Sequence, residues 1–381
     1  METYKLRDLC STEISDGTHQ TPTYSETGYI FLSSKNVTTG KIDWNNVMYI
    51  PESLHNELYK RIRPQRDDIL LAKNGTTGVA AIVDRDEVFD IYVSLALIRP
   101  DKSKVLPRYL LYAINSTPSK EFFNSNLKGI GVPNLHLKHI RETPIRVPSF
   151  DEQEHIIAVL DKVSNLLEHR KQQLEQLDEL VKSRFIELFM GKGYPTKTVD
   201  EVSLGKGEYG AQSASSEYDP TRPRYVRITD INDDGTLNDD VVASVNPADD
   251  EQYKLEYGDF MFARMGATVG KTYAFIEGNQ IFAGYLIRYR LNQELINPRY
   301  LFWYTRLDEY RNWAKLNQSG AAQPGINAKK YGSLQIPLPP IKEQNAFSAF
   351  VKQTDKSKLE VQKSLEKLEV LKKALMQKYF G

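Results

Sequence analysis

The segment Gly266-Ala-Thr-Val-Gly270-Lys271-Thr272 is the part of this sequence most similar to a phosphate-binding loop. A Walker loop needs four residues between its two glycines, and this segment has three. The first half of the chain has a similar stretch, Gly75-Thr-Thr-Gly78, which contains no lysine. We therefore interpret both stretches as glycine turns between strands and not as sites of nucleotide hydrolysis.

Imidazole and thiol groups are confined to the first half of the chain. The single cysteine, Cys10, cannot form an internal disulfide or build a zinc site on two or more thiolates. If both halves perform the same task, that task does not use imidazole. The segment Asn297-Pro298-Arg299-Tyr300 differs from the Asn-Pro-Pro-Tyr motif of amino-methyltransferases at its third residue. The sequence therefore predicts no catalytic residues, no metal site and no cofactor on this chain. The histidines are His19, His55, His136, His139, His155 and His169.

The composition is that of a globular protein. Of 381 residues, 40% are hydrophobic and 26% are charged. The 50 basic and 50 acidic side chains give a net charge of zero, which argues against indiscriminate binding of nucleic acid by a basic domain. No apolar run of ~18 residues is present, and the first residues lack the apolar segment of a signal peptide. We expect a cytoplasmic protein without a membrane segment.

The chain contains an internal duplication with an offset of 191 residues. Pro107-Arg-Tyr-Leu110 recurs as Pro298-Arg-Tyr-Leu301, and Glu152-Gln153 recurs as Glu343-Gln344. Between residues 129 and 189, 14 of 61 positions are identical to the position 191 residues later. Self-similarity at a fixed offset is the signature of a repeat, so we expect each half to have the same fold.

Each copy begins with a segment of mixed α and β character. Short apolar runs bounded by Gly, Asn and Asp predict strands, and a proline predicts the first turn of the helix that follows them. In the first copy the predicted strands are 29–32, 68–72, 79–83 and 92–98, followed by a helix at 107–125. In the second copy they are 225–228, 259–263, 268–275 and 285–289, followed by a helix at 298–317.

Each copy ends in a long helical segment without Gly or Pro. Its apolar residues recur in steps of three and four, which is the 3.5-residue period of a coiled-coil seam. A helix of ~40 residues is ~60 Å long, and such a narrow stripe needs a partner to cover it. Residues 151–194 carry a net charge of −3 and residues 341–381 a net charge of +4, which favours pairing of the two segments. The alternative is that each helix packs only on its own domain. The predicted seam residues are Ile156, Leu160, Val163, Leu167, Leu174, Leu177, Val181, Val351, Val361, Leu365, Leu368 and Leu375.

The order and duplication of several motifs resemble those of the specificity (S) subunit of type I restriction–modification enzymes. The resemblance covers the whole chain, although each motif alone is weakly specific. In the first copy the motifs are Asp16-Gly-Thr-His-Gln-Thr-Pro22, Asp68-Ile-Leu-Leu-Ala-Lys-Asn-Gly75, Gly129-Ile-Gly-Val-Pro-Asn-Leu135 and Ile145-Arg-Val-Pro-Ser-Phe-Asp-Glu-Gln153. In the second copy they are Gly258-Asp-Phe-Met-Phe-Ala-Arg-Met-Gly-Ala-Thr-Val-Gly270, Gly320-Ala-Ala-Gln-Pro-Gly-Ile326 and Ile336-Pro-Leu-Pro-Pro-Ile-Lys-Glu-Gln344.

The resemblance implies an α+β fold with an internal duplication and pseudo-twofold symmetry. Two similar mixed α/β target recognition domains are then joined by two long antiparallel coiled-coil helices. The expected parts are a first target recognition domain at 1–147, a central long helix at 148–192, a second target recognition domain at 193–338 and a C-terminal long helix at 339–381, which pairs with the central helix.

The resemblance also implies a function and partners. Each domain would read one half of a bipartite, asymmetric site in double-stranded DNA, while the helical pair sets the spacer and docks two methyltransferase (M) subunits. The M subunits, and not this chain, would bind S-adenosylmethionine. Restriction (R) subunits, where present, would add cleavage that uses ATP and Mg. Two alternatives stay open: the S subunit of a fused restriction–methylation enzyme that cuts on both sides of its site, and a scaffold that binds proteins and not DNA.

Polar residues in the predicted loops are the candidates for contact with DNA. Arg, Lys, Asn and Gln bind base edges, whereas Ser, Thr and main-chain N–H groups hold the phosphate backbone. The alternative for each residue is an ordinary polar turn. In the first domain the candidates are Thr18, His19, Gln20, Lys35, Asn36, Lys73, Asn74, Thr76, Thr77 and Lys128. In the second domain they are Gln212, Ser213, Arg227, Thr229, Arg264, Thr268, Gln318, Ser319 and Gln323.

Corresponding loops of the two copies have diverged. Asp16-Gly-Thr-His19 corresponds to Tyr209-Gly-Ala-Gln212, and Lys73-Asn74-Gly75 corresponds to Arg264-Met265-Gly266. Because each base pair presents a distinct pattern in the major groove, we expect the two domains to prefer different bases. We expect the half-sites to lie about one helical turn apart, roughly 10 bp from centre to centre.

Overall fold

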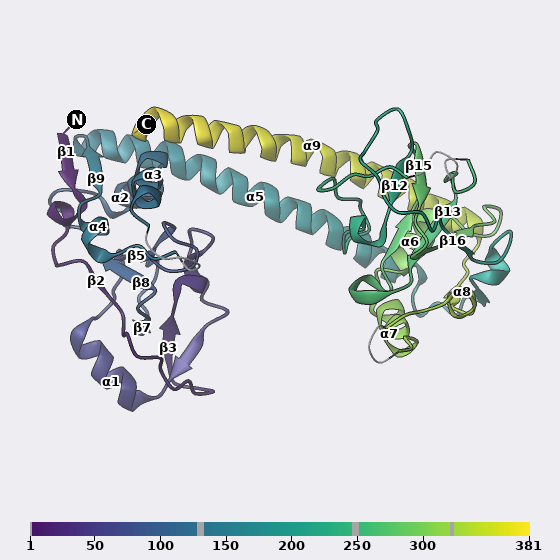
Figure 1. Ribbon diagram of the computed structural model, residues 1–381, viewed down its shortest axis with the longest axis horizontal. Helices are drawn as coiled ribbons and strands as arrows, with labels where there is room; N and C mark the ends of the chain where they lie inside the picture. The colour runs from purple at the N-terminus through teal and green to yellow at the C-terminus, as the bar shows by residue number, and fades with distance from the viewer. Residues whose placement is uncertain (1, 128–132, 246–250, 321–323) are drawn as a thin grey trace. The chain divides into compact units, whose positions relative to one another are not determined.

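The computed structural model describes residues 2–127, 133–245, 251–320 and 324–381. The chain forms two compact units (Figure 1). Unit 1 consists of Met1–Lys171 and Lys363–Gly381, and unit 2 consists of Gln172–Gln362. Each unit therefore combines one globular domain with part of each of the two long helices.

Unit 1 is built on a four-stranded antiparallel sheet in the order β2-β8-β5-β6. All four residues of β5 are buried, as expected for a continuous apolar run. A second sheet pairs β3 in parallel with β7 and antiparallel with β4, and a two-stranded ribbon pairs β1 with β9. The strands are β1 (Glu2–Lys5), β2 (Ser15–Asp16), β3 (Tyr29–Leu32), β4 (Met48–Ile50), β5 (Ile69–Ala72), β6 (Ala80–Ile82), β7 (Phe89–Ile91), β8 (Leu95–Ile98) and β9 (Pro144–Val147). The shorter helices are α1 (Glu52–Arg61), α2 (Pro107–Ile114), α3 (Thr117–Ser125) and α4 (Leu137–Arg141).

Unit 2 repeats this arrangement. Its four-stranded sheet has the order β11-β16-β13-β14, its parallel pair is β12 with β15, and its ribbon pairs β10 with β17. Its described residues include no counterpart of α1. The strands are β10 (Thr196–Thr198), β11 (Glu208–Tyr209), β12 (Arg224–Val226), β13 (Asp259–Ala263), β14 (Thr272–Ala274), β15 (Gln280–Phe282), β16 (Leu286–Arg290) and β17 (Gln335–Pro337). The shorter helices are α6 (Pro298–Tyr304), α7 (Asp308–Leu316) and α8 (Ala328–Gly332).

Several predicted elements are confirmed, and others are shorter or divided. The strands predicted at 29–32 and 259–263 coincide with β3 and β13. The helix predicted at 107–125 is wrong as a single element, because Ser116 is extended between α2 and α3. The helix predicted at 298–317 is likewise divided, at the extended Leu307. The strand predicted at 92–98 begins only at Leu95, since a turn occupies residues 93–94.

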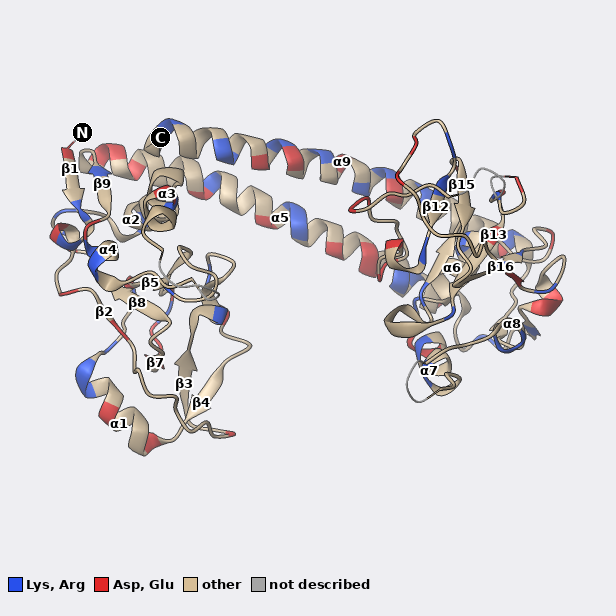
Figure 2. Cartoon of the chain, in the orientation of Figure 1, with Lys and Arg blue, Asp and Glu red and all other residues tan. Residues whose placement is uncertain are grey.

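The two long helices are α5 (Phe150–Phe189) and α9 (Ile341–Phe380), each of 40 residues. Unit 1 contains the start of α5 with the end of α9, and unit 2 contains the end of α5 with the start of α9, which is an antiparallel arrangement. In unit 2 the rings of Phe185 and Phe347 lie 5.3 Å apart. All the predicted seam residues are buried or half-buried. Acidic and basic residues are both distributed along the length of the two helices (Figure 2).

A buried glutamine fixes the start of each long helix to its domain. The Gln153 side chain accepts a hydrogen bond from Leu106 N (2.8 Å) and donates one to Pro148 O (3.0 Å). Gln344 accepts from Asn297 N (2.9 Å) and donates to Pro339 O (2.8 Å). The repeated glutamine therefore has a structural role, because its buried side chain satisfies main-chain groups next to the start of the helix.

An aromatic contact fixes the end of each long helix. The ring of Phe380 lies 5.4 Å from that of Tyr109, and the ring of Phe189 lies 5.0 Å from that of Tyr300. Both tyrosine hydroxyls donate to a main-chain carbonyl at 2.7 Å, that of Arg146 and that of Pro337. Burial raises the pKa of both tyrosines, so each remains a neutral donor. Phe189 and Phe380 are 191 residues apart, so the internal duplication predicts that they are equivalent, and these contacts confirm it.

The last residue of the chain lies beside the first strand. Arg146 pairs with Thr3 in the β1–β9 ribbon, and its Nη1 donates to Gly381 O at 2.9 Å. We expect a circular permutant that joins Gly381 to Met1 by a short linker, and opens at Lys192-Gly193, to fold, because it cuts only an exposed turn. Circular dichroism should show a native spectrum and a melting temperature within about 5 °C of the parent. An unfolded permutant, alongside a folded parent with the same linker inserted after Lys192, would contradict this prediction.

Candidate nucleic-acid interface

Four main-chain segments of unit 1 meet at the end of β5. We call residues 16–20, 73–78, 92–94 and 133–135 the loop cluster of unit 1. The hydrogen bonds that join them are Thr18 N to Ile91 O (3.2 Å), Val93 N to Thr18 O (3.0 Å), Lys73 N to Ser94 O (2.9 Å) and Leu135 N to Lys73 O (2.8 Å). The loops therefore form one surface on a fixed backbone, as is typical of binding residues held by a rigid sheet.

Unit 2 repeats the same four bonds. We call residues 209–213, 264–268, 283–285 and 324–327 the loop cluster of unit 2. The bonds are Ala211 N to Phe282 O (2.9 Å), Gly284 N to Ala211 O (2.7 Å), Arg264 N to Tyr285 O (3.0 Å) and Ile326 N to Arg264 O (2.9 Å). The structure thus confirms that Asp16–His19 corresponds to Tyr209–Gln212 and that Lys73 corresponds to Arg264.

A glycine is required at the same point of both clusters. A Cβ atom on Gly17 would lie 1.9 Å from Ile91 O, and one on Gly210 would lie 2.3 Å from Phe282 O. Neither carbonyl can move away, because it accepts the hydrogen bond of the next residue, Thr18 or Ala211. This close approach explains why the glycine is repeated while the residues around it differ.

In unit 1 a buried carboxylate neutralises a predicted DNA-contacting lysine. Asp16 is 6% exposed, and its carboxylate lies 2.5 Å from Lys73 Nζ. Its other oxygen lies 3.2 Å from His19 Nε2 and 3.7 Å from Arg61 Nη2. Lys73 is itself 6% exposed, whereas the His19 side chain is 68% exposed. Lys73 therefore holds the loop, and His19 is the member of this group that projects from it.

Helix α1 bonds to the main chain of the loop that contains His19. His55 Nδ1 lies 2.7 Å from Asp90 Oδ2, and the Tyr29 ring stacks on His55 at 3.7 Å. Burial raises the pKa of Asp90. At its other end the helix presents Arg61, which donates to the main-chain carbonyls of Asp16 and Gly17. The helix therefore connects the core of unit 1 to the His19 loop.

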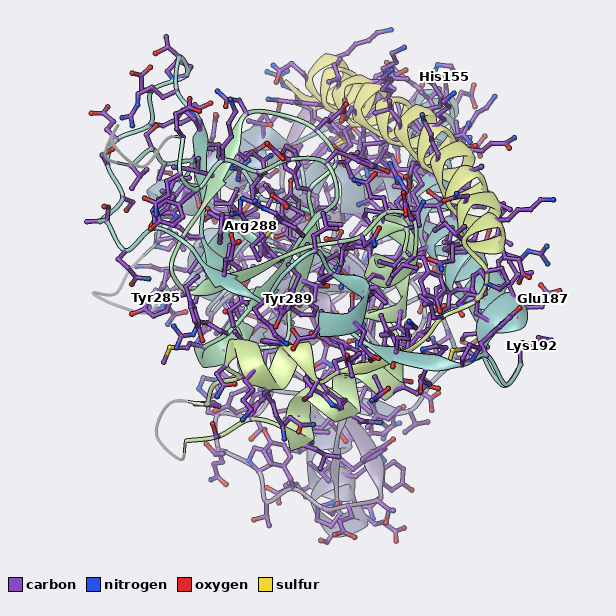
Figure 3. The ribbon with its side chains drawn as sticks, turned by 90° about the vertical axis from the view of Figure 1, so that its right-hand side faces the viewer. His155, Glu187, Lys192, Tyr285, Arg288 and Tyr289 are labelled. Carbon is purple, nitrogen blue, oxygen red and sulfur yellow. The ribbon has the colours of Figure 1, made fainter. Side chains whose placement is uncertain are left out.

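In unit 2 the equivalent position has a cation without a carboxylate. The Arg264 guanidinium carbon lies 4.7 Å from the centre of the Tyr209 ring. Tyr209, which stands at the position of Asp16, is 40% exposed, and the neighbouring Tyr285 is 55% exposed. Figure 3 shows Tyr285 toward the margin of unit 2, with Arg288 and Tyr289 of β16 farther in. The two clusters thus share a backbone but differ in charge.

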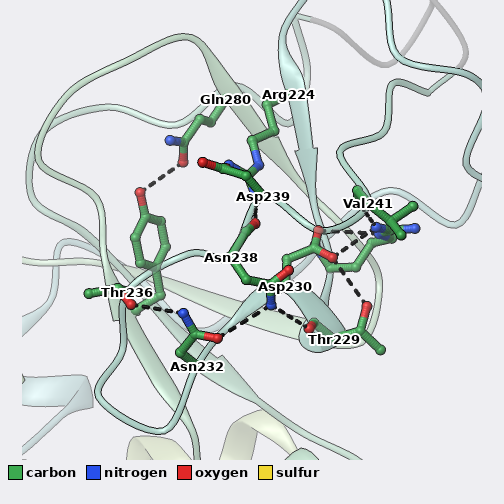
Figure 4. Close-up of polar contacts among 11 residues, drawn as sticks. Arg224, Thr229, Asp230, Asn232, Thr236, Asn238, Asp239, Val241 and Gln280 are labelled. Atoms are coloured by element: carbon green, nitrogen blue, oxygen red, sulfur yellow. Dashed lines mark hydrogen bonds and ion pairs between the residues drawn. The ribbon is translucent and has the colours of Figure 1, made fainter. Parts of the chain in front are cut away.

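The loop that follows β3 in unit 1, and the loop that follows β12 in unit 2, use predicted DNA-contacting residues for their own structure. The Asn36 side chain accepts from Ser33 N and donates to Asn46 O, both at 2.9 Å. In unit 2 the Arg227 guanidinium lies 2.8 Å from Asp230. The Thr229 hydroxyl donates to the same carboxylate at 3.2 Å (Figure 4). The Asn36 amide therefore stabilises its loop in unit 1, and the Arg227 guanidinium stabilises its loop in unit 2. Contact of either residue with DNA stays a prediction.

The other predicted contacts differ in exposure. Gln20, Lys35, Thr76, Gln212, Thr229 and Ser319 are exposed, whereas Thr18, Asn74, Thr77, Ser213, Thr268 and Gln318 are half-buried. Asn74 pairs with Asn134 across the loop cluster of unit 1, and the side-chain oxygen of each is buried without a hydrogen-bond partner. Lys128 and Gln323 lie outside the described residues.

The sequence did not identify three residues that shape these clusters. Asp16 and Tyr209 contact the equivalent cations Lys73 and Arg264, and Arg61 bonds to the main chain of the loop that contains His19. The repeat contained the signal for the first two, since each precedes the repeated glycine directly. No signal marked Arg61, because α1 has no counterpart among the described residues of unit 2.

Comparison with known proteins places this arrangement in a family. Residues 1–178 and 196–372 each match the type I restriction modification DNA specificity domain. The chain belongs to this family. Among its relatives are the putative type I restriction enzyme MjaX specificity subunit of Methanocaldococcus jannaschii, which is 24% identical over 98% of this chain and 91% of the relative, and the EcoKI specificity subunit of Escherichia coli K12, which is 22% identical over 92% and 81%.

The fold agrees with this assignment as a specificity subunit. The crystal structure of the type I restriction-modification S subunit from M. genitalium covers 100% of this chain and 96% of its own length with a TM-score of 0.59, at 15% identity. In the part of this specificity subunit that the structure describes, no helix is long and apolar enough to cross a membrane.

Proposed function

We propose that the two units of this DNA specificity subunit read the two halves of a bipartite, asymmetric DNA site. The observation that carries the proposal is the pair of loop clusters. The same four main-chain hydrogen bonds occur in both clusters, and we call this shared arrangement the backbone frame. The side chains at equivalent positions of the frame differ. Direct readout depends on the donors and acceptors offered to each base pair, so two different sets of side chains select two different sequences.

Methyltransferase subunits supply the chemistry in this proposal. They bind S-adenosylmethionine and dock on the long helices, and restriction subunits, where present, bring ATP- and Mg-dependent cleavage. Exposed apolar residues on the helices, among them Val370 (70% exposed) and Leu180 (49% exposed), are available for such docking. The net charge of this chain is zero, which fits a complex in which the partner subunits make part of the contacts with the DNA phosphates.

The test is modification mapping of genomic DNA from a methylation-free host that expresses this chain with its methyltransferase subunit. We expect two short specified groups about one helical turn apart, roughly 10 bp, with an unread spacer between them. Replacing residues 1–145 with the matching domain of another family member should change one group and leave the other unchanged. A continuous or palindromic site, or a swap that changes both groups, would overturn the proposal.

The purified chain provides the control, because we expect it to transfer no methyl group to DNA without its partners. The two alternatives give other outcomes of the same experiment. A fused restriction–methylation partner would cut DNA on both sides of the mapped site. A protein-binding scaffold would yield no sequence-dependent modification at all.

A further inference from the structure

The equivalent cations Lys73 and Arg264 have opposite surroundings. Lys73 is 6% exposed and makes an ion pair with the buried Asp16. Arg264 is half-buried and follows β13 at the same place in the backbone frame. Tyr209, an uncharged residue, replaces the carboxylate there. Asp16 therefore neutralises the positive charge of Lys73 within unit 1. Tyr209, at the position equivalent to Asp16, does not neutralise the positive charge of Arg264.

The Arg264 guanidinium is held in place by the main chain of Arg264 and by the Tyr209 ring. Among the described residues, none pairs with it or accepts a hydrogen bond from it, and its Nε is buried without a partner. Two features restrict its position. The main chain of Arg264 is bonded on both sides, to Tyr285 O and from Ile326 N, and the guanidinium stacks on the Tyr209 ring. The Tyr209 hydroxyl accepts from Ala328 N at 3.3 Å, which fixes the ring.

A planar guanidinium fixed in this way matches two acceptors that lie side by side. Arginine donates through a rigid fork of N–H groups, and on duplex DNA the pair formed by guanine O6 and N7 fits that fork. A phosphate contact needs charge but not a fixed plane, and it makes no use of the stacked ring. The exposed neighbours Gln212 and Tyr285 are uncharged, which is typical of a base-reading surface and not of a phosphate grip.

We propose that Arg264 reads a guanine in the half-site of unit 2, and that Lys73, its counterpart, reads no base in the half-site of unit 1. The inference rests on the proposed function and makes it specific, because it names one base and one residue. Tyr209 is the positioning residue that holds the guanidinium in its plane.

The experiment measures methylation of a randomised DNA library by the complete chain with its methyltransferase subunit. We expect Arg264→Gln to lower modification of the preferred sequence by roughly 5- to 150-fold and to relax the preference for guanine at a single position of one half-site. Arg264→Lys, which keeps the charge but loses the fork, should relax the same position. Equal weakening on every sequence, with Arg264→Lys near normal, would indicate a phosphate contact and overturn the proposal, as would the absence of any change.

The controls separate this inference from the proposed function. Arg311→Gln removes an exposed arginine of the same unit and should change no position. Tyr209→Ala should relax the same position as Arg264→Gln, whereas Tyr209→Phe, which keeps the stacked ring and loses only the bond to Ala328 N, should relax it less. An unchanged guanine preference in Tyr209→Ala would refute the positioning role. If the unsubstituted complex selects no bipartite sequence, the proposed function fails first. If it does select one but Arg264→Gln changes no position, only this inference fails.

Discussion

Removal of residues 341–381 is expected to leave a chain that aggregates or dimerises. The deletion takes away Phe347 and Val351 from the core of unit 2 and Phe380 from the core of unit 1. Each of these side chains is at most 6% exposed, and burial of such a side chain stabilises by about 1.5–3 kcal/mol. The deletion would also leave an apolar stripe on α5 open to water. The residues of that stripe are Ile156, Leu160, Leu174, Leu177 and Val181.

Light scattering and size-exclusion chromatography measure this effect directly. Two point variants on α9 separate loss of the buried seam from a general effect of altering the helix. Val351→Lys places an ammonium group at a site that is 2% exposed and should also cause association, whereas Val370→Lys, at a site that is 70% exposed, should change the unfolding free energy by no more than about 0.5 kcal/mol. A truncated chain that stays monomeric and soluble would show that α5 does not depend on α9.

Substitution of Lys73 by methionine is expected to destabilise unit 1 by about 3–5 kcal/mol, because it leaves the Asp16 carboxylate buried without its closest partner. The matched change in unit 2, Arg264→Met, should cost only about 0.5–1 kcal/mol, the size of an exposed cation–π contact. Unfolding in urea, followed by fluorescence, measures both. The contrast follows from the different partners of two residues that stand on the same backbone frame.

A double variant tests whether the cost of Lys73→Met comes from the ion pair. Adding Asp16→Asn should recover more than half of the lost stability, since it removes the buried charge that has lost its closest partner and retains much of the side-chain volume. A loss below about 1 kcal/mol in the single variant would mean that Lys73 is free to bind DNA, and the division of roles between Lys73 and Arg264 would then be wrong.

The architecture was predictable because the sequence contains an internal duplication. The offset of 191 residues places the two long helices, the two tyrosines that receive Phe189 and Phe380, and three of the four segments of each loop cluster in correspondence without any structure. The fourth segment is offset by 193 residues and is aligned by its repeated glycine, Gly17 or Gly210. Periodicity alone identified the buried face of α5 and α9, since an apolar residue every three or four positions allows a single stripe. The Glu-Gln motif was recognised as repeated, and the structure adds the reason, which is the bonding of Gln153 and Gln344 to main-chain groups.

The roles of single polar residues were not predictable, because a turn and a DNA contact use the same residue types. Asn36 and Arg227 have the side-chain chemistry that binds base edges, but each also bonds to a main-chain carbonyl of its own loop, 10 and 14 residues away. Lys73 was a candidate on charge alone, and its pairing with Asp16 depends on a contact across 57 residues. Local sequence does not encode such pairings, so exposure and partners had to come from the fold.

The division of the chain into units has a consequence for synthesis. Unit 2 is one continuous stretch, whereas unit 1 needs residues 363–381 as well as 1–171. Every residue of unit 2 is therefore synthesised before the last turns of α9. Those last turns carry Phe380, which contacts Tyr109 in unit 1. A premature stop codon after residue 362 would thus damage the domain encoded at the opposite end of the gene and leave the nearer one with all of its residues.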